Sequence, residues 1–176
     1  MKSSAKHLFS LPRRLRGWRL SFMSFEEFLL RQVRQLAFFQ FGVAGELFFP
    51  DGCVVEVSPS TGRPRRIWLD GKCIATIRAM DGWLTLTVSG AQRLNALLEK
   101  GGNRVVVGRE GAEKVAAGYD VSAEHVVEAD ASIVPGMEVL VVDEDNRLIG
   151  VGKAVVAGVE MAELRRGAVV KVRHKV

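Results

Sequence analysis

The sequence predicts an α+β protein: a small N-terminal α/β domain with an antiparallel sheet, followed by a small, partly open β-barrel. In the first half, a helical stretch precedes short apolar runs separated by Asp-Gly pairs, a pattern typical of β-hairpins. The second half holds about five short apolar runs and one short helix, a content typical of a small barrel. A chain of 176 residues is long enough for two such domains.

Two helices are predicted in the first half. Residues 24–38 form the first, with Ser24 as its N-cap and apolar residues at helical spacing: Phe25, Phe28, Leu29, Val33 and Leu36. The second is predicted to begin within residues 89–92, which have a capping-box pattern, and to present an apolar face of Leu94, Leu97 and Leu98. Between the helices, the Asp-Gly turns predict an antiparallel meander with strands at 53–57, 66–69, 72–77 and 83–88.

The second half is predicted to begin with a strand at 104–107 and a helix at 110–117, which Gly118 ends in the left-handed conformation. Further strands are expected at 125–127, 138–142, 148–156 and 168–172. The acidic run 143–145 is interpreted as an exposed hairpin tip rather than a metal site, because Asn146 completes a turn between apolar strands. Gly150 and Gly152 indicate a bend or a close approach of two backbones.

Charge divides the chain unevenly. Residues 1–100 contain 15 Lys and Arg against 8 Asp and Glu, whereas residues 101–176 contain 10 against 12. We therefore expect a basic N-terminal extension at 1–22, a first domain at 23–100 and a second at 103–176. A net charge of +5 and an arm without acidic residues favour a polyanion partner over a merely solvated tail.

Several function classes find no support in the residues. No apolar run is long enough to span a membrane, and Pro12 with four arginines interrupts any signal-peptide core in residues 8–22. With Cys53 and Cys73 expected to be buried free thiols, a cytoplasmic protein is predicted. There is no phosphate-binding glycine loop, no nucleophile elbow and no set of metal ligands, so we expect no enzymatic activity, no cofactor and no metal.

Binding is the remaining class, and three basic groups are candidates for it. The first is the arm from Lys2 to Arg19, and the second is a turn at 61–66 that is expected to place Arg63, Arg65 and Arg66 on one loop. The third is the terminal strand, where Lys171, Arg173 and Lys175 are expected to alternate onto one face. Such groups suit contacts to phosphates, although simple solvation is the alternative for each.

The order of motifs in the second half resembles that of a PUA domain, a small pseudo-barrel found in RNA-modifying enzymes. The matching segments are 105–108, 111–118, the glycine loop 118–121, the strand 135–143, 148–154, 160–161 and the closing strand 167–173. The first half is similar to the small α/β domain that precedes PUA in the archaeal archaeosine tRNA-guanine transglycosylase family. Its matching segments are 41–42, 47–50, 61–63, 70–72, 75–78 and 81–87.

The resemblance implies an RNA surface on the helix, the glycine loop and the last strand. It assigns this surface to Gly111, Lys114, Gly118, Tyr119, Ser122, His125, Lys171 and Arg173, with Lys175 adjoining them. Ser122 and Glu124 depart from that family, which tends to have an aromatic residue and a lysine near those positions. The family's catalytic barrel, with its aspartate nucleophile and zinc cysteines, has no counterpart here, so the resemblance implies the RNA-binding half alone.

Two hypotheses about function follow. The first is a non-enzymatic protein that binds structured RNA, with tRNA favoured because the similar enzyme grips tRNA near its acceptor end, and rRNA as the second candidate. The second is an adaptor, which supplies RNA binding to a separate catalytic subunit or works as a translation factor on a ribosomal subunit. Binding of RNA by the chain alone distinguishes the first hypothesis from the second.

Overall fold

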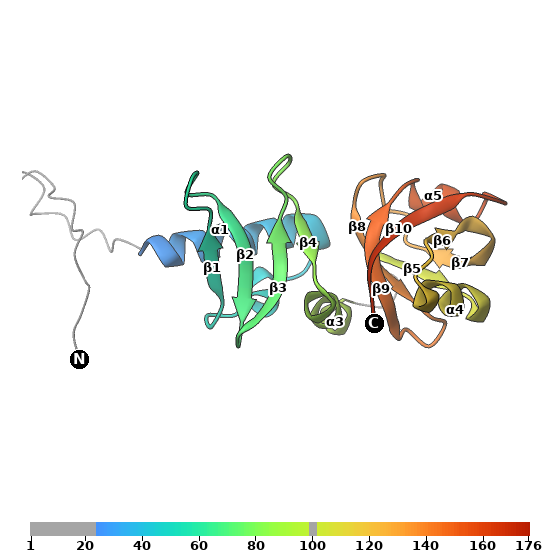
Figure 1. The fold of residues 1–176 in the computed structure, drawn as a ribbon, viewed down its shortest axis with the longest axis horizontal. Helices are drawn as coiled ribbons and strands as arrows, with labels where there is room; N and C mark the ends of the chain where they lie inside the picture. Colours follow the sequence, from blue (N-terminus) through green and yellow to red (C-terminus); the bar gives the residue numbers. More distant parts are fainter. Residues whose placement is uncertain (1–23, 99–101) are drawn as a thin grey trace, which may run out of the picture.

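The computed structural model describes residues 24–98 and 102–176, which form two modules side by side (Figure 1). The first module, residues 24–98, contains a four-stranded antiparallel sheet in the order β1-β2-β3-β4. The second, residues 102–176, contains a six-stranded sheet in the order β6-β10-β9-β8-β5-β7 that curls into a barrel. The predicted α+β fold class is thereby confirmed, whereas the predicted basic extension at 1–22 lies outside the described residues.

Helix α1 (Phe25–Phe41) begins with a capping box, in which Ser24 and Glu27 accept each other's backbone N–H groups at 3.1 and 2.7 Å. It ends at Gly42, which has a φ of 69°. The predicted apolar face is partly wrong. Phe25 and Phe28 are 62% and 45% exposed, and the buried face consists of Leu29, Val33, Ala37, Gln40 and Phe41.

The sheet of the first module consists of β1 (Val54–Val57), β2 (Pro64–Leu69), β3 (Lys72–Ile77) and β4 (Leu84–Leu86). The hairpin between β2 and β3 turns at Asp70-Gly71, where both residues have positive φ angles, as the Asp-Gly signal predicted. A four-residue helix that was not predicted, α2 (Gly45–Phe48), lies against α1. A Cβ at Gly45 would lie 2.4 Å from the carbonyl oxygen of Arg34, so this contact requires glycine.

Helix α3 (Val88–Leu97) begins earlier than the sequence pattern suggested. Its N-cap is Thr87, whose hydroxyl accepts the N–H of Gly90 at 3.3 Å and donates to the carbonyl of Cys73 at 2.7 Å. The predicted capping box at 89–92 is therefore wrong, because Ser89 already lies within the helix.

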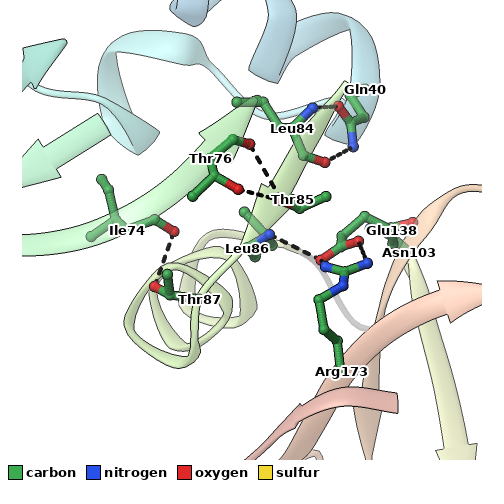
Figure 2. Close-up of polar contacts among 10 residues, drawn as sticks. All are labelled: Gln40, Ile74, Thr76, Leu84, Thr85, Leu86, Thr87, Asn103, Glu138 and Arg173. Carbon is green, nitrogen blue, oxygen red and sulfur yellow. Dashed lines mark hydrogen bonds and ion pairs between the residues drawn. The ribbon is translucent and has the colours of Figure 1, made fainter. Parts of the chain in front are cut away.

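Strand β4 is the edge of the first sheet, and side chains bind the backbone groups on its open side (Figure 2). The buried amide of Gln40, from α1, donates to the carbonyl of Leu84 and accepts its N–H, both at 2.8 Å. The N–H of Leu86 is bound at 2.9 Å by Glu138 of the second module. An edge strand whose polar groups are bound in this way is protected from pairing with another chain.

The barrel consists of β5 (Arg104–Val107), β6 (Val121–Ser122), β7 (Val126–Ala129), β8 (Glu138–Val142), β9 (Leu148–Ala154) and β10 (Ala168–Lys175). Strand β5 pairs in parallel with β8 and antiparallel with β7, while the other pairs are antiparallel. Helix α4 (Arg109–Ala117) and the short α5 (Gly158–Met161) flank the barrel (Figure 1). The turn Ala123–His125 is a 3-10 helix, so the strand predicted at 125–127 begins one residue later.

A single apolar core crosses the boundary between the modules. Leu140, Val142 and Val151, on the outer face of the barrel, are buried in the same cluster as Leu86 and Leu94 of the first module. Continuous burial of this kind fixes the orientation of the two modules, because separating them would expose these side chains to water.

Arg104 adds polar contacts to this boundary. Its guanidinium is buried and donates to the carbonyls of Asn95 and Leu98, at the end of α3, at 2.8 and 3.2 Å. Burial lowers the pKa of Arg104. Removing this cation would leave carbonyl groups at the C-terminal end of α3 without their donor.

Candidate RNA-binding surface

The glycine turn after α4 brings an aromatic ring, a lysine and open backbone together. Gly118 has a φ of 101° and ends the helix, as predicted, and its N–H donates to Val115 at 2.9 Å. The next residue, Tyr119, is 67% exposed. The ammonium group of Lys175 donates to the carbonyl of Ala116 at 2.8 Å and lies 3.7 Å from where a Cβ of Gly118 would be. This turn presents a stacking surface and a cation, the two groups that unpaired nucleotides require.

Lys114, on the same helix, belongs to a small polar cluster. Its Nζ lies 2.9 Å from Nε2 of His125 and 3.1 Å from a carboxylate oxygen of Glu110. The hydrogen bond and the charge of Lys114 lower the pKa of Glu110. The Lys114 side chain is 44% exposed, so it can still reach a ligand at the surface.

Gly111 and His125 have packing roles in this cluster. A Cβ at Gly111 would lie 2.6 Å from Cβ of His125, so the glycine lets α4 sit directly on the 3-10 turn. The His125 side chain is only 9% exposed, and Ser122 is half-buried in β6. These residues build the platform beneath Lys114 rather than an open surface.

The predicted basic stripe on the last strand is wrong. The register between β10 and β9 shifts between Val172 and His174, which inserts one extra residue into β10. Lys171 pairs with Lys153, whereas Lys175 pairs with Gly150, three residues away on β9. Because neighbouring residues of a strand point to opposite faces, Lys171 and Lys175 lie on opposite faces of the sheet.

Arg173 is engaged within the protein. Its two terminal nitrogens donate to the carboxylate of Glu138 at 2.7 and 2.8 Å, and the Glu138 side chain is only 3% exposed (Figure 2).

The close approach predicted at the two glycines of β9 is confirmed, because a Cβ at Gly152 would lie 2.2 Å from the carbonyl oxygen of Lys171.

The arginines of the 61–66 segment do not share one loop. Arg63 lies in the turn, whereas Arg65 and Arg66 belong to β2 and point to opposite faces of the sheet. Arg66 pairs with Glu56 at 2.9 Å, but the exposed side chains of Arg63 and Arg65 form no hydrogen bond or ion pair with any described residue. These two guanidinium groups are therefore open to a partner.

A groove that the sequence analysis missed lies beside them. It has a volume of about 770 Å³ and is bounded by α1, by the β1–β2 turn with Arg63 and Arg65, and by residues 77–82 at the β3–β4 turn. We call it the edge groove. A smaller hollow of about 220 Å³ lies between Trp83 and the 134–137 loop, and Arg78 and Asp81 line both. The Asp-Gly signal located the hairpin, but no local pattern shows that α1 completes a groove with it.

In residues 24–98 and 102–176, no three His, Cys, Asp or Glu side chains gather in a way that could hold a metal ion. None of the helices within these ranges is long and apolar enough to cross a membrane. Cys53 and Cys73 are free thiols, and burial raises the pKa of both.

Both halves of the chain match known domain families. Residues 31–100 match the patch-forming domain C2 of tRNA-guanine transglycosylase, and residues 103–176 match the PUA domain. The chain contains a C2 domain followed by a PUA domain. The resemblance seen in the sequence is thereby confirmed, and these relationships support RNA binding.

Relatives with this pair of domains include archaeal enzymes. The C2–PUA chain is 43% identical over 145 residues to tRNA-guanine(15) transglycosylase of Pyrococcus abyssi, covering 82% of the chain and 24% of the enzyme. The enzyme of Methanothermobacter thermautotrophicus is 39% identical over 145 residues, which are 82% of the chain and 22% of the enzyme. The chain thus spans less than a quarter of the length of these relatives and matches their C-terminal part.

Solved structures show a similar arrangement of helices and strands over most of the chain. A hypothetical protein of Pyrococcus horikoshii superposes with a TM-score of 0.68 at 26% identity, covering 84% of the chain and 89% of that protein. A PUA-domain protein of Thermoplasma acidophilum has a TM-score of 0.58 at 21% identity, with 82% and 87% covered, and shows the fold alone.

Proposed function

We propose that the protein is a non-enzymatic RNA-binding protein that recognises structured RNA through its PUA domain, with tRNA as the favoured ligand. The observation that carries this proposal is the exposed Gly118-Tyr119 turn beside the ammonium group of Lys175, within a domain matched to PUA. A ring on which a base stacks and a backbone free of Cβ atoms suit an unpaired RNA end. The name of the related enzymes favours tRNA.

Binding of purified protein to bulk tRNA, with and without the 3′-terminal CCA, tests this proposal. We expect tight binding that weakens when CCA is removed, and a log–log salt slope of about −3 to −5 for four to six neutralised phosphates. Tyr119→Ala should weaken binding about tenfold or more, while Tyr119→Phe should keep most of it. Weak binding that ignores both CCA and Tyr119 would contradict the proposal.

A second role, as an adaptor for a separate catalytic chain or a ribosomal subunit, has one observation in its favour. Helix α1 exposes large apolar side chains at both of its ends, with Phe25 at 62% exposure in the first turn and Phe38 and Phe39 at 65% and 79% in the last turn. Exposed apolar side chains are a common feature of protein–protein interfaces. These exposed side chains favour a protein partner.

Purification of the tagged protein after nuclease treatment tests the adaptor role. A catalytic chain or ribosomal subunit should remain bound, and Phe38→Ser with Phe39→Ser should release it without changing tRNA binding. An assay for guanine exchange into tRNA by the protein alone tests its non-enzymatic character, and exchange above background would overturn it.

A further inference from the structure

The edge groove is lined by cations on its rim. The β1–β2 and β3–β4 turns project from the same end of the strands of the first sheet (Figure 1), and α1 closes the groove between them. Arg63 and Arg65 stand on the first turn and the adjoining strand with no partner among the described residues. Arg78 stands on the second, and its Nε is buried without a hydrogen-bond partner in the described structure.

Apolar side chains line the rest of the edge groove. Val33 and Leu36 come from α1, and Ile77 and Met80 come from the opposite wall. Met80 is 99% exposed, so its side chain is accessible to a ligand in the groove. The volume of about 770 Å³ lies within the range of sites for small organic molecules, about 300–1,000 Å³. A flat, partly apolar group that carries negative charge would complement these walls.

The path from the edge groove leads to the PUA domain. Arg78 and Asp81 also line the small hollow between the modules, together with Trp83 and Lys153. Lys153 pairs across β9 and β10 with Lys171, and neither lysine forms an ion pair within the described residues. The cations therefore continue from the rim of the groove across the module boundary.

We propose that the edge groove binds one unstacked nucleotide of a single-stranded RNA segment. Arg63 and Arg65 hold the flanking phosphates, and the base lies against Leu36, Ile77 and Met80. The RNA segment then passes Arg78 and Trp83 and reaches Lys153. Guanidinium groups pair with phosphate oxygens in a bidentate manner, and apolar or aromatic side chains accept the face of any base. The site rests on the proposal that RNA is the ligand, but it is separate from the Tyr119 turn.

The carboxylate of Asp81 weakens phosphate binding in the edge groove, so replacing Asp81 tests the proposal. Its carboxylate pairs with Arg78 at 3.1 Å and faces the same groove, so it repels phosphate. One of its oxygens also accepts the N–H of Trp83 at 3.1 Å, which an asparagine can still do. Asp81→Asn should therefore preserve the turn, free Arg78 and strengthen RNA binding about twofold to fivefold.

The main test measures binding of the full chain to a fluorescein-labelled 12-nucleotide single-stranded RNA of mixed sequence, across a salt series. Arg65→Glu should weaken binding at least tenfold and reduce the salt slope by about one or more. The matched control is Lys72→Glu, an exposed charge reversal at the β2–β3 turn, at the opposite end of the strands of the same sheet, which should change binding less than twofold. Met80→Ser should weaken binding without changing the slope, because it removes an apolar contact only.

The outcomes separate this site from the PUA site. Equal losses in Arg65→Glu and Lys72→Glu would mean a diffuse electrostatic field and would overturn the groove. If Tyr119→Ala weakens tRNA binding while Arg65→Glu changes binding of neither RNA, the proposed function stands and the groove proposal fails. If neither variant matters, both fail. If a polyglutamate peptide binds through Arg65 and the RNA does not, the groove is instead a site for acidic protein segments.

Discussion

Glu138 binds Arg173 through two hydrogen bonds of 2.7 and 2.8 Å and, with the same carboxylate, accepts the backbone N–H of Leu86 across the module boundary (Figure 2). One buried acid thus joins β10, the last strand of the barrel, to β4, the edge strand of the first sheet. Arg173 was assigned to the RNA surface from the sequence, but this contact gives it a role in holding the two modules together.

Arg173→Met should therefore act on stability rather than on RNA. Removing one partner leaves the Glu138 carboxylate buried and unpaired, which should cost about 2–3 kcal/mol because Arg173 is itself a third exposed. Urea unfolding measures this loss. The salt slope for RNA binding should stay unchanged, and a slope that falls by about one would restore Arg173 to the RNA surface. Adding Glu138→Gln to Arg173→Met should recover part of the stability.

Gly152→Ala should destabilise the barrel. Its Cβ would lie 2.2 Å from the carbonyl oxygen of Lys171, on backbone that cannot move without breaking the pairing of β9 and β10. We expect a loss of about 2–3 kcal/mol in the free energy of unfolding. Gly52→Ala is the control, because its nearest neighbour would be a side-chain carbon of Leu69 at 3.8 Å. Equal effects of the two substitutions would contradict the close packing at Gly152.

Gln40→Leu should loosen the edge of the first sheet. The substitution keeps the volume but removes both hydrogen bonds to Leu84, which leaves a buried N–H and a buried carbonyl without partners. The expected cost is about 2–4 kcal/mol. Hydrogen exchange of the Leu84 amide should also accelerate strongly, whereas the amide of Leu140 in the barrel should be much less affected.

Asp130 gives the protein a stability that depends on pH. Desolvation by itself would raise the pKa of Asp130, but hydrogen bonds from the N–H groups of Ser132 and Asn103 outweigh it and lower the pKa. The ionised form therefore stabilises the fold above the unfolded pKa of about 3.9, and this contribution disappears as the pH falls through the lower folded value. Asp130→Asn should lose about 1 kcal/mol at pH 7 and nothing at pH 2.

Unfolding of both proteins across pH 2–8 checks this expectation for Asp130. A constant difference between the wild type and Asp130→Asn over the whole range would show that the carboxylate charge contributes nothing.

Local sequence signals were sufficient for most of the fold. The Asp70-Gly71 hairpin and the Gly118 helix end follow from residues that tolerate positive φ, and strands β3, β5 and β8 were predicted with their observed ends. The start of α3 was misplaced because its N-cap is Thr87, whose hydroxyl is held by a hydrogen bond to the carbonyl of Cys73, 14 residues away in the sequence. The short helices α2 and α5 have too few residues to show a period.

The candidate site was harder to predict, because its parts meet only in the folded chain. Alternation along β10 suggested one basic face, but a register shift after Val172 cannot be read from the strand's own residues. The edge groove needs α1 and two turns at once, so its arginines were found as a sequence cluster while Arg78 and Met80 were not. Tyr119 was assigned through the resemblance to PUA domains, and the local pattern predicted only that Gly118 ends the helix just before it.

The core shared by Leu140, Val142, Val151 and the first module has a consequence for selectivity. Because the modules cannot swing, the separation between the edge groove and the Tyr119 turn is a fixed length built into the protein. An RNA that engages both sites must present its unstacked nucleotide and its unpaired end at that same separation. Rigid spacing of this kind selects among RNAs by their three-dimensional shape, so molecules with identical sequences at both contacts but a different number of base pairs between them would be rejected.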